Sequence, residues 1–294
     1  MKDFPVPVRS IGPGSQPADE DAELDFLPMP REMNTFAMPR VPEQADPSAL
    51  AASRDLLARF LAALQAWDPD GATPGPRADM RAIGPAALEI TNQMLGEGEV
   101  AIQIKGPRPC RIQESVFTGL WRCCEFDAQG RLVADWLEAG AVPVVALEAA
   151  RTGGGDGLPA VEWPAGAMNS PALVAEIASQ LQSRDPTARA HVINLTLFPM
   201  TPDDHLVLEH ALPVGPVAMI SRGFGNCHVT STLTRGVWRV QYFNAMNTLI
   251  LNTLEVVGVP EVALASSEDL ADSRERLAEL VQWMDESVAE ATPH

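Results

Sequence analysis

The stretch SRGFGNCHVTST, residues 221–232, places Cys227 beside His228, two residue types that can form a thiol nucleophile and its base. Its composition predicts a strand, in which successive side chains point to opposite faces of a sheet. The two side chains therefore cannot form a catalytic dyad with each other. Because a buried cysteine packs as a small hydrophobe, we expect Cys227 to face the core and His228 to face outward as a contact residue.

Other sequence signals for catalysis or cofactor binding are weak. The glycine-rich segments RTGGGDG and RGFGNC match neither a phosphate-binding loop nor a dinucleotide-binding turn. There is no C-x-x-C pair, and the five histidines are scattered. We therefore predict no catalytic residue, no resident cofactor and no metal site. Two alternatives stay open: a metal or iron–sulfur carrier in which Cys110 and Cys227 meet across an internal symmetry axis, and a thiol enzyme based on Cys227.

The composition excludes several classes of partner. The 294 residues carry a formal net charge of −18, from 21 basic and 39 acidic residues, whereas nucleic-acid surfaces need clustered Lys and Arg. No nucleic-acid partner is expected. Neither an apolar run long enough to span a membrane nor an export signal is visible, so we expect a cytoplasmic protein without membrane insertion. Four cysteines are too few for a disulfide scaffold, which favours free thiols.

The chain contains an internal repeat. Shifted by 117 residues, positions 95–147 align with positions 212–264 without a gap, and 19 of the 53 aligned pairs are identical. Self-similarity of this kind predicts two copies of one structural unit. Weaker matches upstream extend the repeated unit to residues 53–147 and 170–264. The identical pairs include Cys110/Cys227, Trp121/Trp238, Arg122/Arg239, Glu138/Glu255 and Pro143/Pro260.

Each copy has the same predicted order of elements. An amphipathic helix comes first, at residues 56–67 and 172–182, because apolar residues recur there at every third or fourth position. Four β-rich segments separated by Gly- or Asn-bearing turns then favour an antiparallel sheet. The closing V-P-x-V-A-L predicts a further helix, since proline suits a helical first turn. The predicted strands are EVAIQI, PCRIQES, LWRCCEF and RLVADWL in the first copy, and PVAMIS, NCHVTSTL, VWRVQYF and TLILNTL in the second.

We therefore predict an α+β fold of two pseudo-symmetric repeats, each an amphipathic helix plus a four-stranded antiparallel sheet. An amphipathic C-terminal helix is expected over residues 267–290. The predicted boundaries are an extended or disordered, Pro-rich, acidic leader at 1–50, a first repeat at 51–150, a Gly/Pro-rich linker at 151–169, a second repeat at 170–266, and a C-terminal helix and tail at 267–294.

The leader holds 9 of the 26 prolines, a density that blocks helix and favours extended chain. Its segment LDFLPMPREMNTFAMPR interleaves the prolines with apolar residues, among them Met29 and Phe36. A purely solvating tail does not need so many apolar residues. The segment is expected to dock, either along its own domain or on a partner.

The second copy is the candidate partner-binding surface. Between residues 212 and 264 it carries three arginines and two glutamates, and uncharged hydrogen-bonding groups replace the charges of the first copy. Protein-recognition surfaces are depleted of charge and enriched in aromatic residues. The alternative is that these residues only cap turns and solvate an exposed sheet. The candidates are Phe224, Asn226, His228, Thr230, Thr232, Arg239, Tyr242, Asn244, Asn247 and Asn252.

An arginine follows a tryptophan in both copies, at Arg122 and Arg239. We expect each guanidinium to stack on an aromatic ring or to pair with Glu138 or Glu255, so that its role is structural.

Two stretches carry a family resemblance. The run GNCHVTSTLTRGVWRVQYFNAMNTLILNTLEVVGVPEVALA resembles the C-terminal domain of the hydrogenase expression/formation proteins HupH, HoxQ and HyaF, and FLPMPREMNTF resembles their N-terminal signature. The resemblance implies an accessory protein for maturation of membrane-bound uptake [NiFe]-hydrogenases. Its partner would be the iron–sulfur small subunit before export, with a second maturation chaperone as a further possible partner. The family brings no catalytic residues to carry over.

Taken with the resemblance, the residues indicate a cytoplasmic chaperone rather than an enzyme. On this hypothesis the second sheet and the N-terminal arm hold the immature small subunit until its clusters are assembled. Binding must be reversible, so a modest interface is expected.

Overall fold

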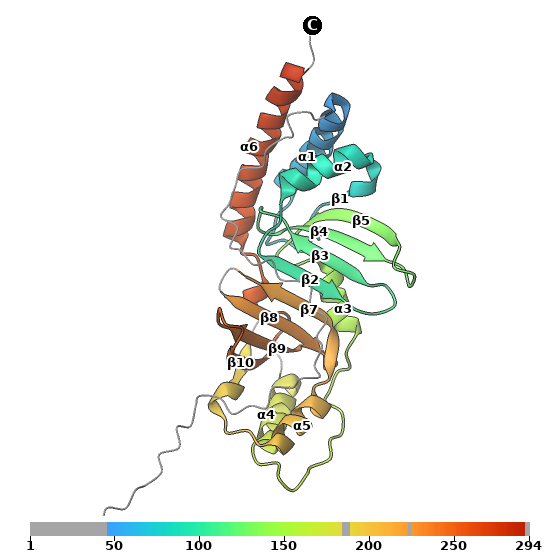
Figure 1. The fold of residues 1–294 in the computed structure, drawn as a ribbon. Helices are drawn as coiled ribbons and strands as arrows, with labels where there is room; N and C mark the ends of the chain where they lie inside the picture. The colour runs from blue at the N-terminus through green and yellow to red at the C-terminus, as the bar shows by residue number, and fades with distance from the viewer. Residues whose placement is uncertain (1–45, 184–188, 223–224, 292–294) are drawn as a thin grey trace, which may run out of the picture. The chain divides into compact units, whose positions relative to one another are not determined.

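The computed structural model of the chain describes residues 46–183, 189–222 and 225–291 (Figure 1). The side chains of residues 290 and 291 are not described. Residues 1–45 lie outside the described part, so the predicted arm, with Met29 and Phe36, lies there too. No helix among the described residues combines the length and the apolar character needed to cross a membrane.

Ten antiparallel strands form one sheet in the order β1-β5-β4-β3-β2-β7-β8-β9-β10-β6. The α+β class is confirmed, and the four predicted strands of each repeat pair in chain order, but β2 also pairs directly with β7, so the two four-stranded units form one sheet. Two short strands, β1 and β6, add to the edges. The strands are β1 (Arg77–Asp79), β2 (Val100–Ile104), β3 (Cys110–Glu114), β4 (Leu120–Phe126), β5 (Leu132–Ala139), β6 (His191–Asn194), β7 (Val214–Ser221), β8 (Asn226–Thr232), β9 (Val237–Phe243) and β10 (Leu249–Val256).

The eight predicted strands are all present, and corresponding strands in the two halves of the sheet have corresponding registers. In the first half, Arg122 on β4 lies opposite Leu137 on β5. In the second half, Arg239 on β9 lies opposite Leu254 on β10, each residue 117 positions later. Side chains at equivalent positions therefore point to the same face of the continuous sheet.

The described residues form six helices beside the sheet: α1 (Pro47–Ala66), α2 (Pro85–Leu95), α3 (Val144–Thr152), α4 (Ser170–Gln182), α5 (Pro202–Ala211) and α6 (Ser267–Ala291). The same part of the chain contains the short 3-10 turns η1 (Met80–Ala82), η2 (Leu195–Leu197) and η3 (Glu261–Ala263). The helix predicted after Pro260 is wrong: only the 3-10 turn η3 forms there, because the backbone is already extended at Leu264. Ala265 N–H then donates to Ala141 O at 2.9 Å, and α6 begins two residues later.

The two faces of the sheet are covered differently. On one face, α3 packs over a continuous core that contains Trp121, Trp238, Cys110 and Cys227. On the opposite face, one apolar cluster joins α1, α2 and α6 to β4 and β5. A separate cluster joins α4 and α5 to β9 and β10 (Figure 1). The middle strands of this opposite face belong to neither cluster.

The side chain of Asp204 joins α4 to α5. It is fully buried, and its Oδ1 accepts hydrogen bonds from the N–H groups of Met168, Asn169 and Ser170, where α4 begins, at 2.8–3.0 Å. Its Oδ2 accepts from Thr201 N–H at 3.0 Å, which completes the capping box of α5. Burial raises the pKa of Asp204, but these hydrogen bonds outweigh burial and hold the pKa well below its usual range.

Replacing Asp204 with Asn should lower the free energy of unfolding by about 2 to 4 kcal/mol, because a buried group then loses several charged hydrogen bonds. A carboxyl whose pKa is depressed on folding stabilises the fold above its unfolded pKa, near 3.8, and this contribution disappears as the pH falls. Denaturant unfolding at pH 7 and pH 3 should therefore show a smaller difference between wild type and variant at pH 3. Asp203→Asn is the matched control, because the Asp203 carboxylate accepts one backbone hydrogen bond here, from Gly166 N–H.

Candidate functional site

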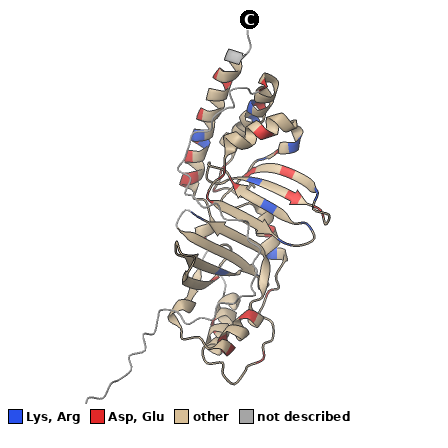
Figure 2. Ribbon diagram, in the orientation of Figure 1, with Lys and Arg blue, Asp and Glu red and all other residues tan. Residues whose placement is uncertain are grey.

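A set of polar side chains lies on the face of β8–β10 that is opposite to α3. The cross-strand pairs Thr230–Arg239, His228–Gln241 and Gln241–Asn252 place these five residues on one face. We call them the polar strip. All five are half-buried. Figure 2 shows that charged residues are sparse on this half of the sheet compared with β3–β5.

His228 packs against an aromatic ring at one end of the polar strip. Its imidazole lies 4.7 Å from the ring of Phe243, centroid to centroid, at an interplanar angle of 45°. Burial lowers the pKa of His228 below its ordinary value, which favours the neutral form of the ring. Asn226, also half-buried, lies opposite Phe243 and extends the same face to the start of β8.

Arg239 lies on β9, the middle strand of the polar strip, opposite Thr230. Burial lowers its pKa, and only the charge of Glu209 on α5 acts in the opposite direction. No hydrogen bond or ion pair joins the guanidinium to any other residue that the structure describes. The predicted partner Glu255 lies on the other face, opposite Trp238. The prediction that Arg239 pairs with Glu255 or stacks on a ring is therefore wrong.

Asn252 lies diagonally from Arg239 on β10. Its backbone N–H donates to Thr196 Oγ1 at 2.9 Å. Its side-chain Oδ1 is buried and has no hydrogen-bond partner among the described residues. A buried acceptor without a donor is uncommon in folded proteins and is costly when nothing occupies it.

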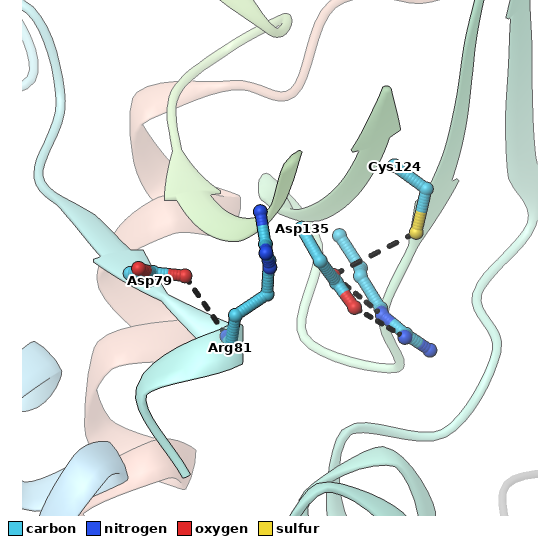
Figure 3. Close-up of polar contacts among 5 residues, drawn as sticks. Asp79, Arg81, Cys124 and Asp135 are labelled. Carbon is cyan, nitrogen blue, oxygen red and sulfur yellow. Dashed lines mark hydrogen bonds and ion pairs between the residues drawn. The ribbon is translucent and has the colours of Figure 1, made fainter. Parts of the chain in front are cut away.

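The equivalent surface of the first half is satisfied internally. Arg122 Nε and Nη2 donate to the two carboxylate oxygens of Asp135 at 3.1 and 2.8 Å. Cys124 Sγ donates to the same carboxylate at 3.6 Å (Figure 3). The predicted pairing of Arg122 with Glu138 is wrong, because Glu138 faces the core and binds Arg77 at 2.9 Å.

Besides Asn226, four described residues of the predicted contact set lie outside the polar strip. Thr232 is buried, and its hydroxyl lies 2.9 Å from Val237 O, inside the β8–β9 turn. Tyr242 belongs to the opposite face, beside Cys227. Asn244 and Asn247 are exposed in the β9–β10 turn: Asn244 Oδ1 accepts two backbone N–H bonds at 2.9 Å, and Asn247 has a φ of 57°. For Thr232, Asn244 and Asn247 the turn interpretation fits better than the contact interpretation.

Two further points concern the predicted set. Phe224 lies outside the described residues. Gln241 belongs to the polar strip although it was not among the candidates. The period of two along VWRVQYF, counted from Arg239, would have identified it.

Cys110 and Cys227 are packed into the core under α3. Cys110 and Cys227 are 1% and 0% exposed, and burial raises their thiol pKa to about 12 and about 11 respectively. Cys110 lies opposite Ile104 and Cys227 opposite Ser221, on opposite ends of the β2–β7 pair. Three strand spacings and four residues separate them, roughly 20 Å, so they do not meet across the symmetry axis.

No group of three or more His, Cys, Asp or Glu side chains with metal-binding geometry occurs in the described part of the chain. A cavity of about 480 Å³ lies on the α3 side of the sheet, away from the polar strip. Leu147 and Ala150 of α3, Trp238 of β9 and Val259 are among its lining residues. Its lining is largely apolar and contains none of the cysteines.

The chain belongs to the family described as HupH hydrogenase expression protein, whose C-terminal conserved region matches residues 50–154 and again residues 167–284. The two matches cover the two halves of the sheet.

Several curated relatives match nearly end to end. The hydrogenase expression/formation protein HoxQ of Cupriavidus necator is 42% identical over 97% of this chain and 99% of its own length. The hydrogenase expression/formation protein HupH of Rhodobacter capsulatus is 39% identical over 96% and 98%. The hydrogenase-1 operon protein HyaF of Escherichia coli is 31% identical over 96% and 97%. A solved structure of the hydrogenase expression protein HupH from Thiobacillus denitrificans covers 39% of this chain at 30% identity, with a TM-score of 0.36.

Cys227 should be unreactive in the folded protein. Its thiol pKa of about 11 leaves on the order of one thiolate per thousand molecules at pH 8, and the sulfur is also shielded from solvent. Iodoacetamide should modify Cys227 at least 100-fold more slowly in native than in denatured protein, as followed by mass spectrometry of peptides. The half-buried Cys124 should react earlier and is the internal control. Rapid native modification of Cys227 would revive the thiol-enzyme alternative.

Proposed function

We propose that this protein acts in hydrogenase maturation as a chaperone that binds the immature iron–sulfur small subunit, and that it does so by binding rather than by catalysis. The observation that carries the proposal is the family membership over both halves of the chain, with relatives named as hydrogenase expression/formation proteins. The choice of the small subunit follows the family resemblance of the sequence. The site of action is then the cytoplasm, before the subunit is exported.

The polar strip supports this proposal as the contact surface. Its five side chains include one charge, and the hydrogen-bonding groups of Thr230, Arg239 and Gln241 are not used by any described residue. Half-buried groups of this kind can exchange water for a polypeptide at low desolvation cost, and the ring of Phe243 beside His228 adds an aromatic surface to the same face. A chaperone must also release its client, and a contact of a few hydrogen-bonding side chains with a single charge fits a modest, reversible affinity.

The chemistry of the cysteines favours binding over metal transfer. A carrier needs thiolates that can reach a metal. Cys110 and Cys227 are buried and far apart, and burial raises the pKa of both thiols, so they stay protonated. The two thiols pack instead against the sheet core that carries Trp121 and Trp238. They are proposed to stabilise the platform on which the polar strip is displayed.

The experiment is an anaerobic pull-down of the immature small subunit by the tagged full-length chain. Wild type should retain the subunit, and His228→Ala/Gln241→Ala should weaken retention at least 10-fold, about 1.4 kcal/mol or more of binding free energy. Asn247→Gly is the matched control, because glycine tolerates the positive φ of this turn and the polar strip is untouched. A truncation lacking residues 1–45 tests the contribution of the predicted arm.

Metal analysis of each eluate separates the alternatives. Retention by wild type and by Cys110→Ser/Cys227→Ser, without stoichiometric metal, supports the chaperone. Loss of retention only in the cysteine variant, with iron bound to wild type, would replace the chaperone with a carrier. Equal retention by the polar-strip variant and wild type would place the contact elsewhere.

A further inference from the structure

The equivalent arginines of the two halves, Arg122 and Arg239, have different surroundings. Arg122 in the first half is held by both oxygens of Asp135, whose side chain is 0% exposed. These hydrogen bonds raise the pKa of Arg122, while burial alone would lower it. The bidentate pair therefore compensates the burial of both charges.

In the second half the arginine is retained but its counter-ion is not. Arg239 occupies the register position of Arg122, and Asn252 occupies the position of Asp135, 117 residues later. Asparagine has the size of aspartate and lacks its charge. The result is a half-buried guanidinium without a carboxylate and, on the neighbouring strand, a buried amide oxygen without a donor among the described residues.

No other described residue supplies a carboxylate that neutralises Arg239. Glu209 on α5 is the one carboxylate whose field reaches Arg239, yet it is exposed and forms no ion pair with it among the described residues. The neighbouring polar-strip residues Thr230, Gln241 and Asn252 are neutral. A partly desolvated cation with five N–H donors in a neutral, half-buried setting is a receptor for one planar anion.

We propose that Arg239 binds a carboxylate side chain, Asp or Glu, of the polypeptide that docks on the polar strip. The bound carboxylate takes the place that Asp135 takes beside Arg122, with two N–H bonds from Arg239. A single arginine suits a singly charged carboxylate, since multiply charged phosphates are usually held by several cationic groups and the chain has a net charge of −18. This inference rests on the proposed function for the identity of the polypeptide, but the chemistry of the site is independent of it.

The decisive variant is Asn252→Asp, which restores the counter-ion that the first half has. It should raise the melting temperature, because an internal carboxylate satisfies Arg239. It should also weaken capture of the immature small subunit at least 10-fold, because the site is already filled. Arg239→Met should weaken capture to a similar extent without the gain in melting temperature.

Asp135→Asn is the matched control in the first half. It should lower the melting temperature, because Arg122 loses its partner, and leave capture unchanged. If Asn252→Asp is stabilised but captures the subunit as well as wild type, Arg239 has no carboxylate ligand in the complex and the proposal is overturned. If Asp135→Asn weakens capture as much as Asn252→Asp, the effect is a general response of the sheet, which also overturns the proposal.

A measurement without the hydrogenase subunit keeps the two proposals separate. The melting temperature of wild type is compared in sodium acetate and sodium chloride at equal ionic strength. Acetate should stabilise wild type more than chloride does, and this difference should vanish in Asn252→Asp and in Arg239→Met. An acetate effect with no capture of the small subunit would retain the carboxylate site and reject the proposed client. Equal responses of wild type and both variants to acetate would reject the site.

Discussion

The pairing of β2 with β7 is the constraint on which the rest of the structure depends. Five consecutive residue pairs, from Val100–Ser221 to Ile104–Val217, join the two halves into one sheet. This register makes the core under α3 continuous, because Ile102 and Met219 lie side by side at its centre. Trp121 and Trp238 then anchor that core on either side, and each indole N–H is satisfied by a backbone carbonyl, at 2.8 and 3.0 Å.

A continuous sheet also decides where a partner can bind. With α3 on one face, the other helices cover the opposite face only toward its two ends, over β4–β5 and over β9–β10. Beside these apolar clusters, the same face also carries polar side chains, on β4 and β5 in the first half and on β8–β10 in the second. In the first half these side chains bind one another, through Arg122, Cys124 and Asp135. In the second half Arg239 and the Oδ1 of Asn252 form no such bond with a described residue, so the same architecture presents a satisfied arginine in one half and an unsatisfied one in the other.

Local pattern was sufficient to predict the eight strands of the repeat, because alternation and turn residues are encoded within each segment, as in VWRVQYF. The pairing of β2 with β7 could not be predicted, since nothing in the sequence of an edge strand shows which other strand it will pair with. The three- and four-residue strands β1 and β6 are too short to show a period. For the candidate site, composition identified the correct strands, and alternation along β9 would have removed Tyr242, which lies on the other face from Arg239. Thr232 shares the face of Thr230, but composition could not show that its hydroxyl bonds within the β8–β9 turn or that Asn244 and Asn247 shape the β9–β10 turn.

The comparison of the two halves carries information that neither half carries alone. A half-buried arginine by itself has many explanations, because long side chains cover apolar surface with their stems. Arg122 shows what the fold does with this arginine when it is purely structural: it supplies a carboxylate from the adjacent strand. Since the backbone register at Arg239 is the same, the missing carboxylate reflects the identity of one side chain, Asn252, and not the geometry of the sheet. A fold that can satisfy a buried charge with a single aspartate, and has an asparagine there instead, gives up stability at that position. Such a loss is typical of sites that are completed by another molecule.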